Sequence, residues 1–536
     1  MAERFERNAR TVSLLTIVSR VTGLVRDAGL ARAFGVGPIM DAFSFAFMIP
    51  NLFRRLFGEG ALSAAFIPRY AELVRDDPEA ARRFAGRAIR TLALALWGFV
   101  AVGELVLLAL WFDAPAAAQP GSPRLACELA MLMLPYMPFV CLMALGGGAL
   151  QTHGRFGPTA ASPILLNLLL IAATLGLVPL AKSGSVDPLA HVRIVAVAVL
   201  VAGALQLAWT MRALRAYRPD FSARDDRSRE DVRSTLRAAG PTMLGLGVLQ
   251  LNAFVDSLIA SWPTVFGPTI LGFAYPLAEG AMSALGNAQR LYEFPLGVFG
   301  ISIATAVFPA LATQSDDPAL FTATLRRALR MTIFIGLPAS LGLALVGREA
   351  VATILQGGEF GPDDTDRVAW ILAGYAPAIW SYQAVHVLAR AFYARRDAMT
   401  PVRISLAMVS LNFALNIALI LTPLREAGLA WSTAICSMLQ AAIMLAILSR
   451  RIGLIVDRET AGGFARTALA TAAMGAAVVA LGHALPAGRE WPTMALRLAA
   501  LVPAGGLGFL LAARLLAMPE LGWTAGRRLA GLRKGA

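Results

Sequence analysis

Apolar residues in this chain come in long runs, which short polar stretches separate from one end of the sequence to the other. A bilayer core of about 30 Å needs roughly 20 apolar residues in a helix, and most of the runs reach that length. The pattern therefore predicts an all-α polytopic membrane protein. Counting runs and their breakers predicts fourteen transmembrane helices, near residues 10–34, 39–70, 88–112, 125–151, 158–181, 190–216, 233–262, 271–312, 322–346, 365–393, 399–421, 426–449, 463–484 and 492–517.

Two of these runs are longer than a straight span requires. The run over 39–70 contains Pro50 and Gly58, and the run over 271–312 contains Pro295 and Gly297. Proline removes a helical hydrogen bond and glycine weakens the helix, so we expect both segments to bend or break inside the membrane.

Charge in the connections between runs predicts the orientation of the chain. The protein carries 48 Lys and Arg against 34 Asp and Glu, and its mean hydropathy is +0.63. Connections at 69–90 and 211–237 are rich in arginine, whereas those at 113–124 and 347–367 are neutral or acidic. Basic connections stay in the cytoplasm, so the alternation places both termini there. This explains the net charge of +14 better than a nucleic-acid partner does.

A weak internal repeat divides the chain. NLFRRLFGEGALSAAFIP (51–68) is matched by EFPLGVFGISIATAVFP (293–309), at a spacing of about 242 residues. Six predicted spans separate the copies, so both copies share one orientation and an axis along the membrane normal relates them. We expect a six-helix N-lobe over 1–220, a six-helix C-lobe over 221–455, and two added helices with a cytoplasmic tail over 456–536.

The segment from Ser19 to Gly60 carries charges that an apolar span does not normally keep. A charge at the bilayer centre costs about 2.5–3.5 kcal/mol, so these groups should face water, one another or a ligand. Most are arginines, which predicts a positively charged cavity with an anionic guest. Two alternatives stay open: Arg26 pairs with the neighbouring Asp27, and Arg54 or Arg55 reaches the membrane surface.

The second copy of the repeat supplies Arg290, with Glu293 on the same helix face. The planar fork of arginine holds two oxygens at once, so arginines converging from three spans would bind a diphosphate where the two bundles meet. The predicted substrate-binding residues are Arg20, Arg26, Asp27, Asp41, Arg54, Arg55, Glu59, Arg290 and Glu293.

A second polar group suits a small hard cation such as sodium, or hydrogen bonding between helices. It consists of Asp256, Asn412, Asn416 and Thr433. The sequence has no phosphate-binding Gly-Lys-Ser/Thr loop, no metal-ligand spacing among its histidines, and three isolated cysteines. We therefore expect no catalytic residues and no cofactor, apart from coupling to Na⁺ or H⁺.

Four segments carry a family resemblance: SRVTGLVRDAGLARAFG, PNLFRRLFGEGALSAAFIP, RLYEFPLGVFGISIATAVFPALA and YARRDAMTPV. They resemble the bacterial lipid II flippase family (MurJ, also called MviN), within the superfamily of multidrug, oligosaccharidyl-lipid and polysaccharide exporters. The resemblance implies fourteen helices, two lobes around a cationic cavity, and alternating access. The implied substrate is lipid II, the undecaprenyl-diphosphate-linked disaccharide-peptide precursor of peptidoglycan, moved from the cytoplasmic to the periplasmic leaflet of the bacterial inner membrane.

The resemblance also implies roles for particular residues. The essential arginines of the family map onto Arg20, Arg26, Arg54 and Arg290, and its sodium site maps onto Asp256 with Asn412, Asn416 and Thr433. Asn416 stands where an acid is expected, and Gln289 stands where some members have an acid. The last two spans would form a groove for the polyprenyl tail. The implied partners are membrane lipids and proteins of cell-wall synthesis or division, and the 262–281 stretch looks long for the outer gate.

Three other functions fit parts of the pattern. A cation-coupled exporter of drugs or of other polyprenyl-linked glycans belongs to the same superfamily, but a drug cavity should be lined by acids and aromatic residues. A glycan polymerase or ligase would need a sizeable external loop with a base. A scaffold in a cell-wall complex would leave the charges within the spans unexplained.

Overall fold

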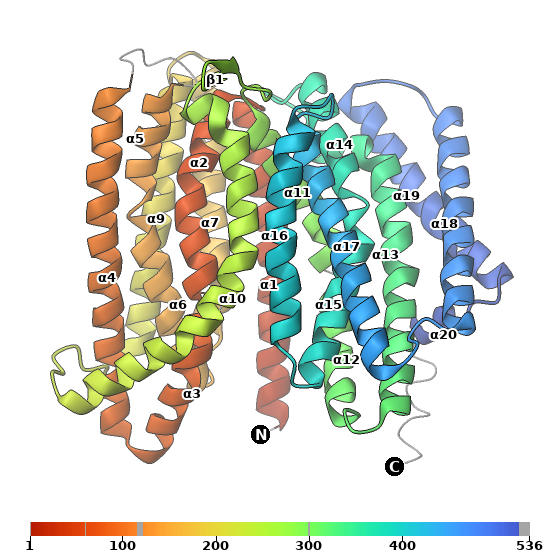
Figure 1. Cartoon of the computed structure of the whole chain (residues 1–536). Coiled ribbons are helices and arrows are strands. Elements are labelled where there is room, and N and C mark those ends of the chain that lie inside the picture. Colours follow the sequence, from red (N-terminus) through yellow and green to blue (C-terminus); the bar gives the residue numbers. More distant parts are fainter. Residues whose placement is uncertain (1, 59–60, 115–121, 298–300, 525–536) are drawn as a thin grey trace. The chain divides into compact units, whose positions relative to one another are not determined.

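The computed structural model describes residues 2–58, 61–114, 122–297 and 301–524, and helices account for nearly all of them (Figure 1). The chain forms two compact units, which are described separately. The first unit is Met1–Ser283 with Gly358–Phe360, and the second is Ala284–Gly357 with Gly361–Ala536.

The first unit contains ten helices among its described residues, together with two short helical turns and a small hairpin. In chain order they are α1 Ala2–Phe34, α2 Pro38–Phe53, the π-helical turn η1 Arg54–Gly58, α3 Ala61–Asp76, α4 Pro78–Asp113, α5 Pro123–Met133, α6 Tyr136–Thr152, α7 Gly157–Leu175, α8 Val178–Lys182, α9 Pro188–Leu214, the 3₁₀ turn η2 Arg215–Tyr217, α10 Asp226–Val265, β1 Thr269–Ile270 and β2 Phe273–Ala274.

The second unit is helical throughout its described residues, and its first helix begins three residues before the limit between the units. Its helices are α11 Ala281–Pro295, α12 Ile301–Thr313, α13 Pro318–Leu355, α14 Pro362–Tyr375, α15 Ala378–Ala394, α16 Met399–Ile420, α17 Ala427–Ile452, α18 Arg458–Ala484, α19 Trp491–Leu515 and α20 Glu520–Thr524.

Several long helices begin at an aspartate followed directly by proline. The Asp77 carboxylate accepts a hydrogen bond from the Ala80 amide at 3.0 Å, and Asp317 caps α13 in the same way. Such a cap satisfies an amide that has no helical partner and contributes about 1 kcal/mol. Proline at the next position has no N–H to leave unsatisfied. These dipeptides therefore fix where the spans start.

Nine helices in the described part of the chain are long and apolar enough to cross a bilayer. They are Pro78–Asp113, Pro123–Thr152, Gly157–Ala181, Pro188–Tyr217, Pro318–Leu355, Met399–Ile420, Ala427–Ile452, Arg458–Ala484 and Trp491–Leu515. This confirms a polytopic helical membrane protein. The other five predicted spans fall on helices that are interrupted or carry more charge, namely α1, α2–α3, α10, α11–α12 and α14–α15.

Breaks in the helices recur at the spacing of the predicted internal repeat. Pro135 separates α5 from α6, and Pro377 separates α14 from α15 at the equivalent point of the second unit, 242 residues later. A π-helical turn begins at Arg54, and the chain again becomes π-helical at Leu296, also 242 residues later. Both predicted bends therefore lie at equivalent positions. The three-part division at 220 and 455 remains a prediction.

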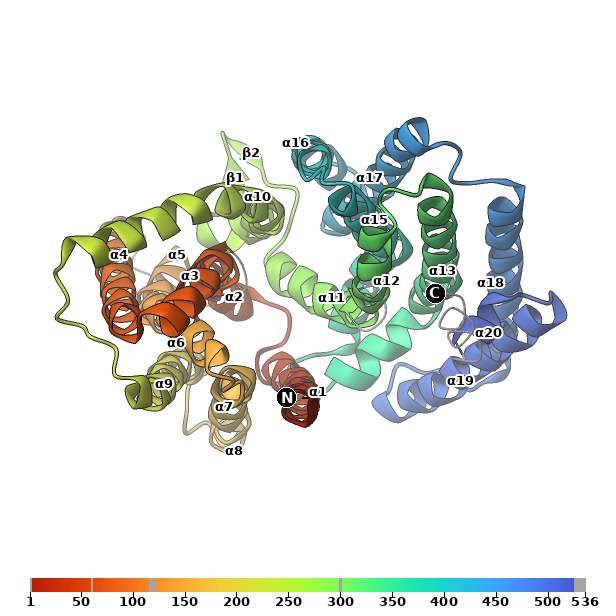
Figure 2. The same ribbon diagram turned by 90° about the horizontal axis from the view of Figure 1, so that it is seen from below.

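The first unit is packed around α6, whose neighbours include α3, α7 and α9 (Figure 2). Its residues from Tyr136 to Leu150 are almost all buried. By contrast, Leu94, Leu105 and Phe112 of α4 are 69%, 68% and 72% exposed. A helix with large apolar residues on its open face is typical of contact with lipid rather than water.

An ion cluster around the buried Arg330 connects three helices of the second unit. The Arg330 guanidinium of α13 donates to Glu520 of α20 at 2.6 Å and to Glu459 of α18 at 2.7 Å. Gly463 allows the close approach, because a Cβ there would lie 2.9 Å from the Arg330 Nε atom. The charged group is thus neutralised where α18 and α20 pack on α13.

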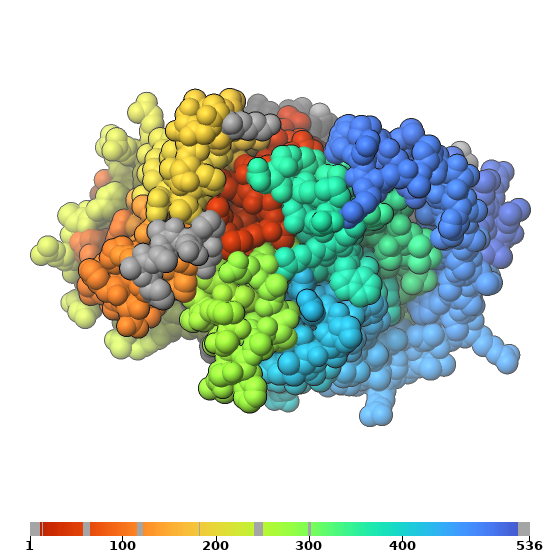
Figure 3. Space-filling view, turned by 90° about the horizontal axis from the view of Figure 1, so that it is seen from above, coloured from red at the N-terminus to blue at the C-terminus, as the bar shows by residue number. Residues whose placement is uncertain are grey.

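The predicted helix over 271–312 is wrong at its start, because α11 begins only at Ala281. Residues 269–274 form an antiparallel hairpin, in which Ile270 pairs with Phe273. Leu271 and Gly272 have φ angles of 50° and 84°, as the two central residues of a tight hairpin turn require. The hairpin is a small exception to the all-α prediction. The region that contains it is coloured green in Figure 3.

Candidate functional site

Arg26 lies on α1 and is held by two partners of the first unit. Its guanidinium donates to the Asp27 carboxylate from Nε at 2.9 Å and from Nη2 at 2.7 Å, and Nη1 donates to the Asn167 side-chain oxygen of α7 at 2.9 Å. The Arg26 and Asp27 side chains are 18% and 12% exposed. The sequence left open whether Arg26 pairs with Asp27, and the first unit contains this pair.

Asn167 fixes the direction of this guanidinium. Its amide nitrogen donates to the Ser19 carbonyl and to the Thr22 hydroxyl, both at 3.1 Å. The amide oxygen is thus turned toward Arg26. A guanidinium has five N–H donors, and these contacts inside the first unit use three of them. The remaining two donors give a pre-oriented fork the capacity to bind an anion.

Arg20 lies seven residues before Asp27 on α1, so the two side chains share one stripe of the helix. It is exposed, and Arg26 is partly buried. Of the predicted ligands in the described part of the first unit, four are arginines and two are aspartates. The set therefore stays positive even with Arg26 neutralised by Asp27.

Arg54 and Arg55 open the π-helical turn and make different contacts. Arg54 donates from Nε and Nη2 to the Asn51 side-chain oxygen, both at 3.1 Å, whereas Arg55 donates to Gln250 of α10 at 3.3 Å. Adjacent helical residues point about 100° apart, which explains the divergence. A π turn in a helix is frequently found at a functional site. Glu59, the next predicted ligand, lies outside the described residues.

Asp41 is fully buried and acts as a cap across helices. Its carboxylate accepts hydrogen bonds from the Gly280 amide at 2.7 Å, the Ser283 amide at 2.7 Å and the Thr264 hydroxyl at 3.0 Å. Gly280 and Ser283 belong to the start of α11, so α2 supplies an acid to the positive end of another helix. The structure gives Asp41 this packing role, and contact with substrate remains a prediction.

Arg290 and Glu293 lie on α11 in the second unit. Arg290 is exposed and Glu293 is half-buried. The Glu293 carboxylate accepts a hydrogen bond from Gln289 at 3.3 Å, one helical turn earlier. Gln289 thus places an amide donor, and not a second acid, one turn before Glu293.

The predicted cation ligands of the second unit form a hydrogen-bonded cluster. Asn416 donates to the Asn412 oxygen at 3.0 Å, Asn412 donates to Ser432 at 3.2 Å and to Thr433 at 3.5 Å, and Ser432 donates to Asn416. The cluster joins α16 to α17 and contains no carboxylate. Asp256 lies buried on α10 in the first unit. Within the described residues, no group of three or more His, Cys, Asp and Glu side chains suits a metal ion.

Three contributors were missed in the sequence: Asn167, Gln250 and Ser432. Each is a polar residue within a largely apolar run, which is the signal that could have identified them, because a buried amide or hydroxyl needs a hydrogen-bonding partner. The partner of Asn167 is 141 residues away along the chain, and no local spacing predicts that pairing.

The family model and the relatives found by comparison with known proteins name the same family. The family model for the lipid II flippase MurJ matches residues 30–498. A relative from Haemophilus influenzae named "Probable lipid II flippase MurJ" is 32% identical over 503 residues, which cover 90% of this chain and 92% of that protein. One of the same name from Rhizobium tropici is 33% identical over 479 residues, covering 88% and 86%.

Solved structures agree on the fold. A lipid II flippase MurJ in an inward closed conformation matches with a TM-score of 0.75 and 23% identity, covering 94% of this chain and 98% of that one. An inward-facing multidrug transporter of the MATE family matches with a TM-score of 0.64 and 14% identity, covering 83% and 98%. At these identities the likeness concerns the fold alone.

Proposed function

This chain belongs to the lipid II flippase MurJ family, and we propose that it moves lipid II from the cytoplasmic to the periplasmic leaflet of the bacterial inner membrane. The family resemblance found in the sequence is thereby confirmed. It makes the protein a multi-pass membrane transporter rather than an enzyme, with a role in peptidoglycan synthesis.

The observation that carries the proposal for the site is the Arg26 fork. It is partly buried on a membrane helix, oriented by Asp27 and Asn167, and keeps two donors beyond those contacts. A guanidinium stays charged when desolvated and binds two phosphate oxygens at once, which suits a diphosphate. We infer that Arg20, Arg26, Arg54 and Arg290 act together on this group.

The proposed transport cycle rests on the repeat. Two lobes related by an axis along the membrane normal rock about a central cationic cavity, which captures the headgroup from the cytoplasm and releases it outside. The full proposal has fourteen spans and both termini in the cytoplasm. It is supported by the nine apolar spans within the described residues, by the five interrupted or charged helices at the other predicted positions, and by the alternation of loop charge.

The residues support coupling to sodium less well than they support binding of a diphosphate. The amides and hydroxyls of Asn412, Asn416 and Ser432 bond one another, as expected of a link between two helices, and supply no negative charge. A sodium site would depend on the Asp256 carboxylate, so no transport step is assigned to the ion. Coupling to Na⁺ or H⁺ and association with cell-wall proteins remain predictions.

An exporter of cationic drugs has the same fold but not the same charges. The MATE likeness supports the fold alone, and an arginine-rich set on α1, η1 and α11 would repel a cationic drug. The observed residues therefore favour an anionic lipid headgroup as the cargo.

The test is depletion of this protein in its own cells, followed by addition of an impermeant reagent that modifies lipid II in the outer leaflet. We expect the fraction of modified lipid II to fall, while total lipid II rises. A modified fraction that stays unchanged after full depletion would refute the proposed function. Cells expressing the intact chain from a second copy provide the control.

A further inference from the structure

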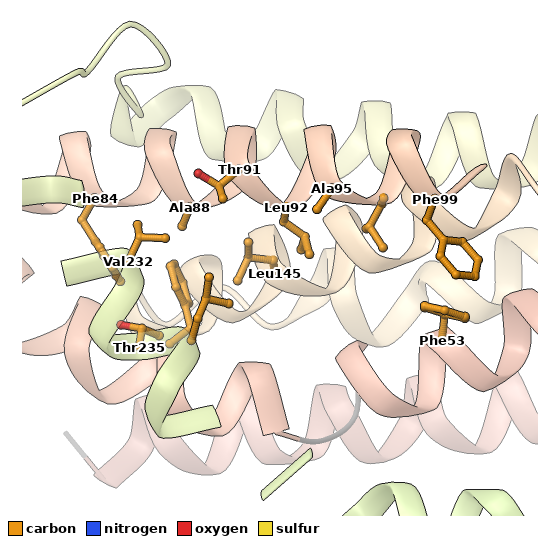
Figure 4. A pocket seen from close by; sticks show the side chains of 13 residues that line it. Phe53, Phe84, Ala88, Thr91, Leu92, Ala95, Phe99, Leu145, Val232 and Thr235 are labelled. Atoms are coloured by element: carbon orange, nitrogen blue, oxygen red, sulfur yellow. The ribbon is translucent and has the colours of Figure 1, made fainter. Parts of the chain in front are cut away.

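An apolar slot lies between α4 and α10 of the first unit, outside the set of arginines described above. Its cavity volume is about 270 Å³. Phe84 and Phe99 mark its two ends along α4, and Val232 and Leu236 line it from α10 (Figure 4). Threonines 91 and 235 are the polar exceptions in its lining. An apolar cavity of this kind does not hold water well, so hydrocarbon is its natural content.

The slot is long enough for an acyl chain that reaches across one leaflet of a bilayer. The distance from Phe84 to Phe99 along α4 is about 22 Å at 1.5 Å per residue, and half of the hydrocarbon core is about 15 Å. Phe84 lies near the start of α4, the end that loop charge places in the cytoplasm. The slot is open at its side, where Phe99 is 46% and Leu236 is 43% exposed.

Arginines flank the open side of the slot on α10. Arg229, Arg233 and Arg237 follow one another at intervals of four residues and are exposed. On a helix, Arg229 and Arg233 lie about 20° and 60° round from the exposed lining residue Leu236. Two acids of this segment lie next to arginines. Asp231 pairs with Arg69 of α3 at 2.6 Å, and Glu230 lies 3.8 Å from Arg237.

Two further arginines hold the connection between α9 and α10 against this end of α4. Arg90 donates to the Phe221 carbonyl at 2.8 Å, and Arg87 donates to the Asp225 carbonyl at 3.0 Å. The start of α10 is thus fixed beside the slot, with an apolar face toward α4 and a basic stripe next to it. This combination is typical of a helix that binds the surface of an anionic membrane.

We propose that the slot binds one anionic phospholipid of the cytoplasmic leaflet, with an acyl chain along α4 and the phosphate on Arg229 and Arg233. The lipid joins the start of α10 to α3, α4 and α6, because these elements all line the slot. The proposal does not depend on the transported substrate. A protein that contains this unit would bind the same lipid whatever cargo it transports.

Native mass spectrometry of the full chain in detergent tests the proposal. The probes are phosphatidylglycerol, phosphatidylcholine with the same acyl chains, and glycerol phosphate, which has the charge without the chains. We expect one phosphatidylglycerol to remain bound, at least tenfold more tightly than phosphatidylcholine, and no retention of glycerol phosphate. Equal retention of the two lipids would overturn the proposal, as would displacement of phosphatidylglycerol by an equimolar amount of undecaprenyl diphosphate.

Two variants locate the site, each with a matched control. The triple change Arg229→Gln, Arg233→Gln and Arg237→Gln should weaken phosphatidylglycerol binding about tenfold, and Ala95→Trp should do so by filling the open side. The controls are the triple change Arg212→Gln, Arg215→Gln and Arg224→Gln, and Leu94→Trp on the lipid-facing side of α4. Thermal unfolding without added lipid checks folding; folded site variants that bind like their controls would refute the assignment.

Discussion

Single residues of the first unit show how a charge is kept inside an apolar helix. Arg26 is neutralised by its neighbour Asp27 and oriented by Asn167, so the cost of burying it is shared among three side chains. Breaking a buried pair by removing one partner costs about 3–5 kcal/mol, because the other charge is left uncompensated. The cluster therefore contributes to stability, and its proposed role in binding needs a separate measurement.

Replacing Arg26 tests its role as a diphosphate ligand. Arg26→Ala should reduce lipid II flipping at least tenfold, and Arg26→Lys should keep part of the activity because lysine retains the charge without the fork. The outer-leaflet modification of lipid II measures activity, and the amount of protein in the membrane checks insertion. Arg75→Ala, at a 75% exposed side chain, is the control. Normal flipping by Arg26→Ala would remove this residue from the site.

Replacing Asn167 tests the positioning of the fork. Asn167→Leu has a similar volume but cannot accept from Arg26 Nη1 or donate to Ser19 and Thr22. We expect activity between those of the intact chain and Arg26→Ala, and little further loss when both changes are combined. Full additivity of the two losses would show that Asn167 acts independently of Arg26.

At the scale of elements, caps and breaks decide where helices begin and how they join. Asp41 on α2 caps the start of α11, and Asp397 caps α16 in the connection that follows α15. The repeated π turns at Arg54 and Leu296 interrupt the equivalent helix of each unit. These features depend on a few polar residues, so a single substitution can test each of them.

Asp41→Ala should loosen the junction of α2 with the start of α11. It removes the acceptor for two buried amides and the Thr264 hydroxyl, and each unsatisfied group costs about 1–3 kcal/mol. We expect a lower temperature of unfolding in detergent and faster hydrogen exchange at the Gly280 and Ser283 amides. Unchanged exchange at these amides would contradict the assigned cap.

Asp397 should make stability depend on acid pH. Hydrogen bonds from the Thr400 hydroxyl and amide, together with Arg451, lower the pKa of Asp397 to about 2. The pKa in the unfolded chain is about 3.9, so the stabilisation is complete above that pH and is lost as pH falls toward 2. Asp397→Ala should cost about 1 kcal/mol at pH 6 and less near pH 3.

Thermal unfolding in detergent at the two pH values measures this difference. Asp316→Ala, at an exposed acid before α13, serves as the control and should change stability little at either pH. An effect of Asp397→Ala that stays constant from pH 6 to pH 3 would show that its charge does not stabilise the fold.

For the whole molecule, the repeat and the excess of arginine suggest a role for the membrane potential. An empty cavity with positive charge is drawn toward the negative cytoplasmic side, and moving one charge through 100 mV is worth about 2.3 kcal/mol. The potential would thus return the empty protein to the state that accepts substrate. This is a prediction of the proposed cycle.

Dissipating the potential with an ionophore should therefore reduce flipping severalfold without unfolding the protein. The outer-leaflet modification of lipid II in treated and untreated cells measures the effect, and a change in external pH at constant potential separates it from coupling to protons. Flipping that continues at the same rate without a potential would exclude this form of coupling.

The sequence by itself determined the class of the molecule, because apolar length, loop charge and helix breakers act locally. It predicted the polytopic helical class and the breaks near Pro50 and Pro295, and it singled out the arginines that an apolar span has no other reason to keep. Helix geometry also requires Arg54 and Arg55, as neighbours in the sequence, to point apart.

Only the tertiary structure decided which polar groups meet. Asn167 reaches Arg26 across 141 positions, Asp41 caps a helix that begins 240 residues later, and Ser432 joins two asparagines of another helix. The hairpin at 269–274 also escaped prediction, because its residues are as apolar as those of a span. Packing brings distant segments together, and a hydrogen bond depends on that final position rather than on the spacing along the chain.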